Sequence, residues 1–149
     1  MKEAIANAGV FNLIIIFVII LLAFFIGSLG YSKAFKVKNL IVYEIEKDEG
    51  YDAKTTEVNI EDMLGKIGYR MNTGFDSRRC PVEDGQSAIN TNSDYQYCVY
   101  RFEHCTRNNA KCSVYYRVIS YMYFDVPIVG QLISVPVIGE TTSFTEIKS

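Results

Sequence analysis

The sequence predicts an α+β protein, in which a long N-terminal helix packs on a small antiparallel sheet of three or four strands held by disulfides. Three observations lead to this fold class. No charged side chain occurs from Ala4 to Ser32, aromatic and β-branched residues dominate after Tyr95, and all four cysteines lie in the C-terminal region. We divide the 149 residues into a short segment 1–9, an apolar helix 10–31, its amphipathic continuation 32–49 and an α+β domain 50–149.

The apolar run from Val10 to Ile26 is interrupted only by Asn12. At about 1.5 Å per residue, twenty-odd helical residues cross the ~30 Å hydrocarbon core of a bilayer. The run therefore predicts a single membrane-spanning helix. A cleaved secretory signal is the alternative, because the small residues Ser28 and Gly30 follow the run. Against it, the apolar stretch is longer than the roughly 7–15 residues of a signal peptide.

The helical pattern continues beyond the apolar run. Apolar side chains recur mostly at i, i+3 and i+4 spacing, while the lysines and the other glutamates lie mainly off that stripe. The stripe consists of Ala34, Phe35, Val37, Leu40, Ile41 and Ile45, with Glu44 among them. We predict one helix from about Ile5 to Glu49 with Gly50 at its C-cap. Two helices with a break at Gly27–Tyr31 are the alternative, since each glycine costs ~1 kcal/mol in a helix interior.

Cys80, Cys98, Cys105 and Cys112 are an even number of cysteines in a small domain, which predicts disulfides and an oxidising compartment. The polar residues 106–111 are predicted to form a hairpin loop, and facing positions across such a loop would bring Cys105 and Cys112 within bonding range. Cys98 and Cys105 would lie more than ~20 Å apart along one strand. Cys80–Cys98 and Cys105–Cys112 are therefore the favoured pairs. Free thiols and a metal site are the alternatives, although no close C-x2-C pair is present.

Two signals disagree about the orientation in the membrane. Lys33, Lys36 and Lys38 directly follow the span, which by the positive-inside rule would place the domain in the cytoplasm. Disulfides indicate an extracytoplasmic domain instead. We favour the second signal, with the lysines at lipid headgroups or paired with acids of neighbouring copies. The predicted location is the cell membrane, with a single pass and an extracytoplasmic C-terminal domain.

The C-terminal domain is expected to contain a short helix followed by three or four strands. Asn59 is the expected N-cap of a helix that runs to Gly68, and residues 72–94 are predicted to form a loop. Pro136 implies an edge strand or a bulge. The many tyrosines are expected in the core rather than on a stacking platform. The predicted strands are Tyr95–Phe102, Cys112–Phe124 and a third within Leu132–Phe144, with a turn at Asp125–Gln131.

No arrangement of residues predicts catalysis. The single histidine, His104, lies in a predicted turn, and phosphate-binding and zinc-protease motifs are absent from the sequence. We therefore expect no enzyme activity, no catalytic or metal site and no cofactor. Nucleic acid is not an expected partner, because the net charge is −2 and no basic stripe occurs. A Ca²⁺ site is an open alternative without the EF-hand pattern. Its ligands would be Asp76, Glu83, Asp84 and Asp94.

The order of these features resembles the type IV pilin superfamily: a short, nearly neutral start, an apolar helix that runs into an amphipathic one, and a disulfide-bonded sheet. The segment YYRVISYMYFDVPIVG…ISVPVIGETTSF is similar to the ends of minor pilin-like membrane proteins of tight-adherence pilus systems in Gram-positive bacteria. The resemblance implies a structural subunit of a cell-surface filament, with pilus assembly machinery and a prepilin peptidase as partners. Cleavage would fall between Gly9 and Val10, but Ile14 stands where pilins carry a glutamate.

In the filament hypothesis, the apolar helix packs among other copies or related pilin-like subunits. The expected helix-packing residues are Asn12, Leu13, Ile16, Ile20 and Phe24. The expected inter-subunit charges are Lys33, Lys36, Lys38, Glu44, Glu46 and Glu49. The alternative is a monomeric single-pass membrane protein, surrounded by membrane lipid, whose ectodomain binds a cell-envelope ligand or partner protein.

Overall fold

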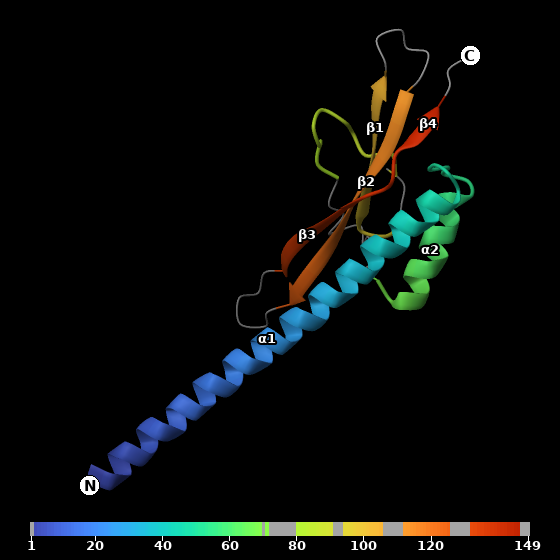
Figure 1. Ribbon diagram of the computed structural model, residues 1–149. Helices are drawn as coiled ribbons and strands as arrows, with labels where there is room; N and C mark the ends of the chain where they lie inside the picture. The colour runs from blue at the N-terminus through green and yellow to red at the C-terminus, as the bar shows by residue number, and fades with distance from the viewer. Residues whose placement is uncertain are drawn as a thin grey trace.

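The structure of the chain, a computed structural model, describes residues 2–69, 71, 80–90, 94–105, 112–125 and 132–146. Within these residues it has a long helix, a short helix and one antiparallel sheet, which confirms the predicted α+β fold class (Figure 1). The elements are α1 (Lys2–Lys47), α2 (Thr56–Ile67), β1 (Tyr97–Cys105), β2 (Cys112–Asp125), β3 (Leu132–Glu140) and β4 (Phe144–Glu146).

Helix α1 is one uninterrupted helix of 46 residues, about 69 Å long at 1.5 Å per residue. Its N-terminal half extends away from the domain, and its C-terminal half lies along the sheet (Figure 1). The predicted single helix is confirmed, and the alternative with a break at Gly27–Tyr31 is wrong. Two glycines cost only about 2 kcal/mol together in a helix interior, and the favourable segments on either side offset that cost.

The C-terminus of α1 differs from the prediction by one residue. The left-handed residue is Glu49, with φ 52°, and not Gly50. The Gly50 N–H donates to the carbonyl of Ile45 at 3.0 Å, and the Glu49 N–H donates to that of Glu46 at 3.2 Å. These two bonds are the Schellman arrangement, which places the left-handed residue immediately before the residue that closes the longer loop.

Helix α2 begins at Thr56, three residues before the predicted N-cap Asn59, which is therefore wrong. The reason is tertiary: the Thr56 hydroxyl donates to Oδ2 of Asp48 at 2.8 Å and accepts from the backbone N–H of Asp52 at 3.3 Å. These bonds fix the first turn of α2 against the end of α1. The helix ends at Gly68, which has φ 65°, as predicted.

Strand β2 is the centre of the sheet. Strand β1 pairs with one edge of β2, from Tyr97 opposite Ser120 to Cys105 opposite Cys112. Strands β3 and β4 pair in succession with the other edge. The predicted third strand is thus divided, because one extra residue lies between the two pairings, and Thr141 bonds there to the Tyr116 N–H through its hydroxyl at 3.0 Å.

The predicted edge position of Pro136 is confirmed, since β3 is the last strand on its side of the sheet. His104 lies within β1 opposite Ser113, so its predicted placement in a turn is wrong. The predicted loop at 106–111 and the turn residues 126–131 lie outside the described residues.

The main hydrophobic core lies between the helices and one face of the sheet. The opposite face carries a second, smaller cluster built on Cys98, Tyr100 and Ile119, against which Cys80 and Ala88 pack. Tyr97, Tyr100 and Tyr116 are buried, as expected of core tyrosines. The main core comprises Val37, Ile41, Ile45, Ile60, Leu64, Tyr69, Tyr97, Val99, Val114, Tyr116 and Val118.

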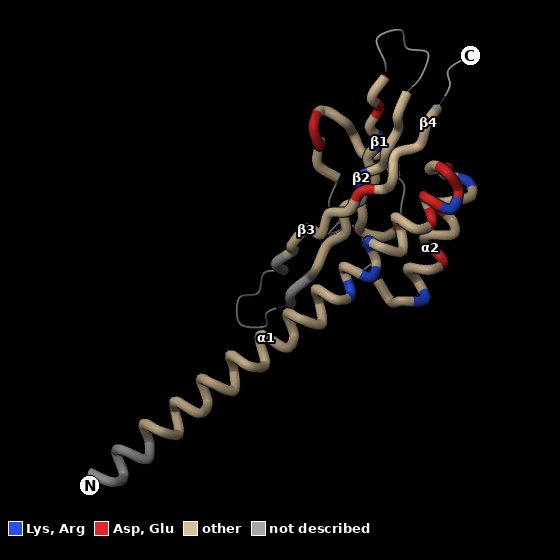
Figure 2. Tube along the Cα trace, in the orientation of Figure 1, with Lys and Arg blue, Asp and Glu red and all other residues tan. Residues whose placement is uncertain are grey.

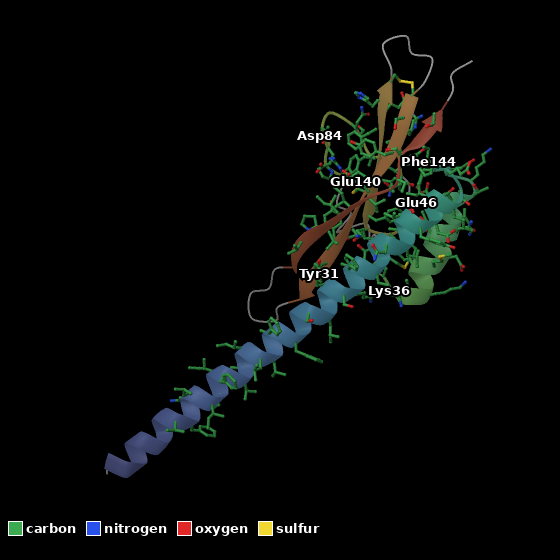
Figure 3. All side chains as sticks on the ribbon, in the orientation of Figure 1. Tyr31, Lys36, Glu46, Asp84, Glu140 and Phe144 are labelled. Atoms are coloured by element: carbon green, nitrogen blue, oxygen red, sulfur yellow. A yellow bond between two sulfur atoms is a disulfide. The ribbon has the colours of Figure 1, made fainter. Side chains whose placement is uncertain are left out.

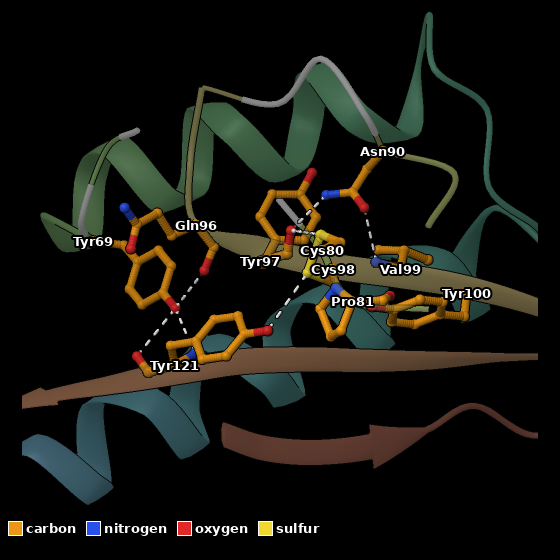
Figure 4. Close-up of a disulfide and its surroundings, with 10 residues drawn as sticks. All are labelled: Tyr69, Cys80, Pro81, Asn90, Gln96, Tyr97, Cys98, Val99, Tyr100 and Tyr121. Atoms are coloured by element: carbon orange, nitrogen blue, oxygen red, sulfur yellow. Dashed lines mark hydrogen bonds between the residues drawn. A yellow bond between two sulfur atoms is a disulfide. The ribbon is translucent and has the colours of Figure 1, made fainter. Parts of the chain in front are cut away.

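Both favoured disulfides are present, Cys80–Cys98 and Cys105–Cys112, and no described cysteine is free. Figure 4 shows the first bond with its surroundings. Next to it, the Asn90 side chain donates to the Tyr97 carbonyl at 2.7 Å and accepts from the Val99 N–H at 2.8 Å. The segment 80–90 is therefore attached to β1 by a disulfide and by hydrogen bonds to the edge of β1 that faces away from β2.

Candidate membrane-spanning and assembly surface

The N-terminal half of α1 exposes apolar side chains on all of its faces. From Val10 to Ile26 every large apolar side chain is exposed, from 41% at Ile15 to 77% at Phe24. Figure 2 shows this half without charged residues, and Figure 3 shows its side chains projecting in all directions. By length and composition, α1 is able to cross a membrane, as predicted.

The predicted helix-packing residues all lie on this exposed half. Leu13, Ile16, Ile20 and Phe24 are 59–77% exposed and, by their spacing of three and four residues, follow one line along the helix. Asn12 is exposed beside them. At the predicted processing site, Gly9 and Val10 are both exposed and lie inside α1. Cleavage there would require this turn of the helix to open.

The three lysines after the apolar run have different environments. The Lys33 ammonium donates to the carbonyl of Gly68 at 2.6 Å, which connects α1 to the end of α2. The Lys38 stem crosses β3 so closely that a Cβ on Gly139 would lie 2.5 Å from Lys38 Cδ. Its ammonium is 4.2 Å from the centre of the Phe35 ring, a cation–π contact. Lys36 is exposed and labelled in Figure 3.

Two of the three predicted acidic contacts are engaged within the subunit. Glu44 is 1% exposed and pairs with Lys47 at 3.0 Å, so its predicted role in an inter-subunit contact is wrong. The hydrogen bond and the charge of Glu44 raise the pKa of Lys47. Glu46 accepts the backbone N–H of Thr142 at 2.7 Å, next to the irregular step between β3 and β4. Glu49 is exposed at the end of α1.

The charge cluster around Arg117, on the face of the sheet opposite the main core, was not predicted from the sequence. The guanidinium bonds to Oδ2 of Asp84 at 2.7 Å and to Oε1 of Glu140 at 2.8 Å, and Glu83 lies 3.6 Å away. These hydrogen bonds raise the pKa of Arg117. The cluster joins the segment 80–90 to β2 and β3. Because its members come from three distant parts of the chain, no local pattern reveals it.

The open Ca²⁺ alternative gains no site in the described part of the chain. Glu83 and Asp84 face Arg117, the backbone of Asp94 bonds to Glu61 at 2.9 Å, and Asp76 lies outside the described residues. Among the described residues, no group of three His, Cys, Asp or Glu side chains is arranged to hold a metal ion.

Two polar side chains, Tyr51 and Glu57, are largely buried where α1 is connected to α2. Burial, together with the neighbouring Tyr97, raises the pKa of the Tyr51 hydroxyl. Glu57 is 9% exposed, and burial raises the pKa of its carboxyl, while the neighbouring Tyr51 hydroxyl acts in the opposite direction. The Glu57 carboxyl therefore binds its proton more firmly in the folded chain than in the unfolded chain, so the stability of the domain depends on pH.

A cavity of about 240 Å³ lies at the end of the domain from which the apolar half of α1 emerges. Helix α1, the end of α2 and strand β2 form its walls. The cavity was not predicted from the sequence, because its walls come from three separate segments. The lining residues are Gly30, Lys33, Ala34, Gly68, Tyr69, Tyr121 and Met122.

Comparison of the chain with protein-family models, with curated proteins and with solved structures gives no match. The function is therefore proposed from the geometry of the chain itself. That geometry consists of an exposed apolar helix half, a small disulfide-bonded domain, and a cavity at the junction between them.

Proposed function

We propose that the protein is a pilin-like structural subunit of a cell-surface filament, which assembles through the N-terminal half of α1. The observation that carries the proposal is the division of a single helix into two parts. The C-terminal part buries Val37, Ile41 and Ile45 against the sheet, whereas the part from Val10 to Ile26 is exposed throughout. A surface that is apolar on all sides requires either lipid or other helices around it.

The proposal includes an orientation with the C-terminal domain outside the cytoplasm. Two disulfides support that compartment, since such bonds persist in oxidising environments. The described sheet also supports a structural role rather than ligand binding through stacked aromatic rings, because Tyr97, Tyr100 and Tyr116 are buried in its two cores. Before assembly, lipid would surround the apolar half of the helix, and in the filament other copies or related subunits would replace it.

Cysteine cross-linking in cells tests this proposal, because the described cysteines are all paired and an introduced thiol is distinct from them. Ile16→Cys places a thiol on the apolar half, where Ile16 is 59% exposed. Val58→Cys is the matched control on α2, where Val58 is 58% exposed. Treatment with a short bis-maleimide should give dimers and a ladder of higher species for Ile16→Cys and monomer for Val58→Cys.

Shearing of the cell surface provides the second measurement. The intact chain should appear in sheared filaments, and the mass of its N-terminus should distinguish a chain that starts at Met1 from one that starts at Val10. Strict retention in membranes as a monomer, with no Ile16→Cys cross-link, would contradict the filament and favour a single-pass protein whose ectodomain binds an envelope ligand.

A further inference from the structure

The cavity beside Lys33 lies at the depth of the lipid headgroups if the apolar half of α1 spans the membrane. Lys33 follows Ile26 by seven residues, about 10 Å along the helix. The run from Val10 to Ile26 is only about 25 Å long, so a hydrocarbon core of ~30 Å extends about 2 Å past Ile26. Lys33 then lies about 8 Å beyond the hydrocarbon, at the outer side of a headgroup layer of roughly 5–8 Å. Tyr31 and Phe35 are 54% and 42% exposed on the same part of α1, with ring centres 6.1 Å apart. Aromatic side chains and lysines are typical of this interfacial layer.

The polar chemistry of the cavity is that of a site for an anion. Among the described side chains that line it, Lys33 alone carries a charge, and none is a carboxylate. Its ammonium has three donors, of which the Gly68 carbonyl takes one, so donors remain for a second acceptor. Within the described chain, no acidic side chain forms a salt bridge with Lys33, so its charge is not neutralised there.

The size and shape of the cavity fit a small headgroup. Its volume of about 240 Å³ is below the roughly 300–1,000 Å³ of sites for whole drug-sized ligands. Gly30 forms the wall on the membrane side and has no side chain that would separate the cavity from a lipid beside α1. A lipid could thus insert its phosphate at Lys33 while its acyl chains stay along the apolar half of the helix.

We propose that this cavity binds the headgroup of an anionic phospholipid, with the Lys33 ammonium on the phosphate. The inference rests on the membrane span and not on filament assembly. Bound lipid would hold the domain at a fixed height above the bilayer. Removal of the subunit from the membrane would require release of that lipid as well as desolvation of the helix.

The test uses the full chain in detergent micelles that contain equal amounts of phosphatidylglycerol and phosphatidylcholine, with native mass spectrometry as the readout. Wild type should retain one phosphatidylglycerol in clear preference to phosphatidylcholine. Lys33→Gln should reduce this preference at least fivefold. Lys36→Gln is the matched control, since it removes the same charge three residues away from a lysine that does not line the cavity. Its preference should stay within twofold of wild type.

A second variant separates the cavity from the charge. Gly30→Leu fills the cavity on its membrane side and leaves all lysines in place, and it should lose the preference as Lys33→Gln does. Equal losses for Lys33→Gln and Lys36→Gln would overturn the proposal in favour of diffuse surface attraction, as would wild-type behaviour of Lys33→Gln. Equally tight binding of the deacylated headgroup, glycerophosphoglycerol, would identify a site for soluble phosphates instead of lipid. Extraction of the protein from vesicles by carbonate would, separately, contradict the membrane span.

Discussion

At the residue scale, Tyr69 completes the sheet where β1 has ended. Strand β1 starts at Tyr97 opposite Ser120, so the next residue of β2, Tyr121, has no strand partner on that side. The Tyr69 hydroxyl accepts the Tyr121 N–H at 2.8 Å and donates to the Gln96 carbonyl at 2.9 Å (Figure 4). One side chain from the end of α2 thus satisfies backbone groups that are otherwise buried without a ladder bond.

Tyr69→Phe should therefore lower the free energy of unfolding by about 1–3 kcal/mol, because it leaves buried backbone groups without their partner while keeping the ring. The measurement is urea unfolding of the full chain in detergent, followed by tyrosine fluorescence. Tyr43→Phe is the matched control, as Tyr43 is 61% exposed, and its effect should stay within about 0.5 kcal/mol. Equal effects of the two substitutions would contradict the role of Tyr69.

Glu57 makes the stability depend on pH. Burial raises its carboxyl pKa above the ordinary 4.5, so the folded chain holds the proton more firmly than the unfolded chain. This contribution is fully present below pH 4.5 and is lost as the pH rises through the folded-state pKa. Glu57→Gln should thus raise the free energy of unfolding relative to wild type at pH 7, with a difference that shrinks towards pH 4. Urea unfolding at both pH values measures it, and a difference independent of pH would refute it.

At the scale of elements, local patterns predicted which elements exist better than where they end. The length of α1 followed from the absence of charge and the subsequent stripe, both of which are local. The start of α2 did not follow from a local pattern, because it depends on the hydrogen bond between Thr56 and Asp48, which joins two elements. The division between β3 and β4 depends on Thr141, whose hydroxyl replaces a backbone partner of Tyr116. Neither tertiary bond has a signature in the sequence around it.

The two disulfides should contribute unequally to stability. Cys80–Cys98 closes a separation of 18 residues and fixes the segment 80–90, whereas Cys105–Cys112 closes a separation of 7 at the end of a hairpin. The entropy of loop closure gives about 3 and about 2.5 kcal/mol, respectively. Burial does not separate the two bonds, because Cys98 is 2% and Cys112 is 0% exposed, so the difference comes from the loop and from the segment 80–90. Paired Cys→Ser variants in urea unfolding should therefore show the larger loss for Cys80/Cys98, and the opposite order would contradict this account.

At the scale of the whole molecule, some features of the candidate sites follow from the composition of the chain, and others arise only when distant segments fold together. The exposure of Ile16 and Phe24 follows from a run too long and too apolar for a small domain to cover. The burial of Glu44, the cluster around Arg117 and the cavity at Lys33 do not follow, since each needs side chains from separate segments. A lysine pattern alone could not indicate that Lys33 lines a cavity while Lys36 does not.

The extracytoplasmic orientation gives a prediction for the chain in its native membrane. All four thiols should be oxidised, so a maleimide reagent should add no mass before reduction and four labels after reduction under denaturing conditions. Non-reducing and reducing gels should differ in mobility for the same reason. Complete labelling without reduction would place the domain in a reducing compartment, which is the location that the lysines after the span indicate.

Because α1 is continuous, a small tilt of its apolar half in the membrane displaces the domain above the membrane by a large distance. Membrane helices tilt by about 20° on average, and the part of α1 from Ile26 to Lys47 extends roughly 31 Å beyond the apolar run. A tilt of that size displaces the far end of the helix sideways by roughly 10 Å. Because α1 has no break at Gly27–Tyr31, the domain tilts together with the helix. Bilayer thickness, or the crossing angle with a neighbouring helix, would therefore set the direction in which the domain points.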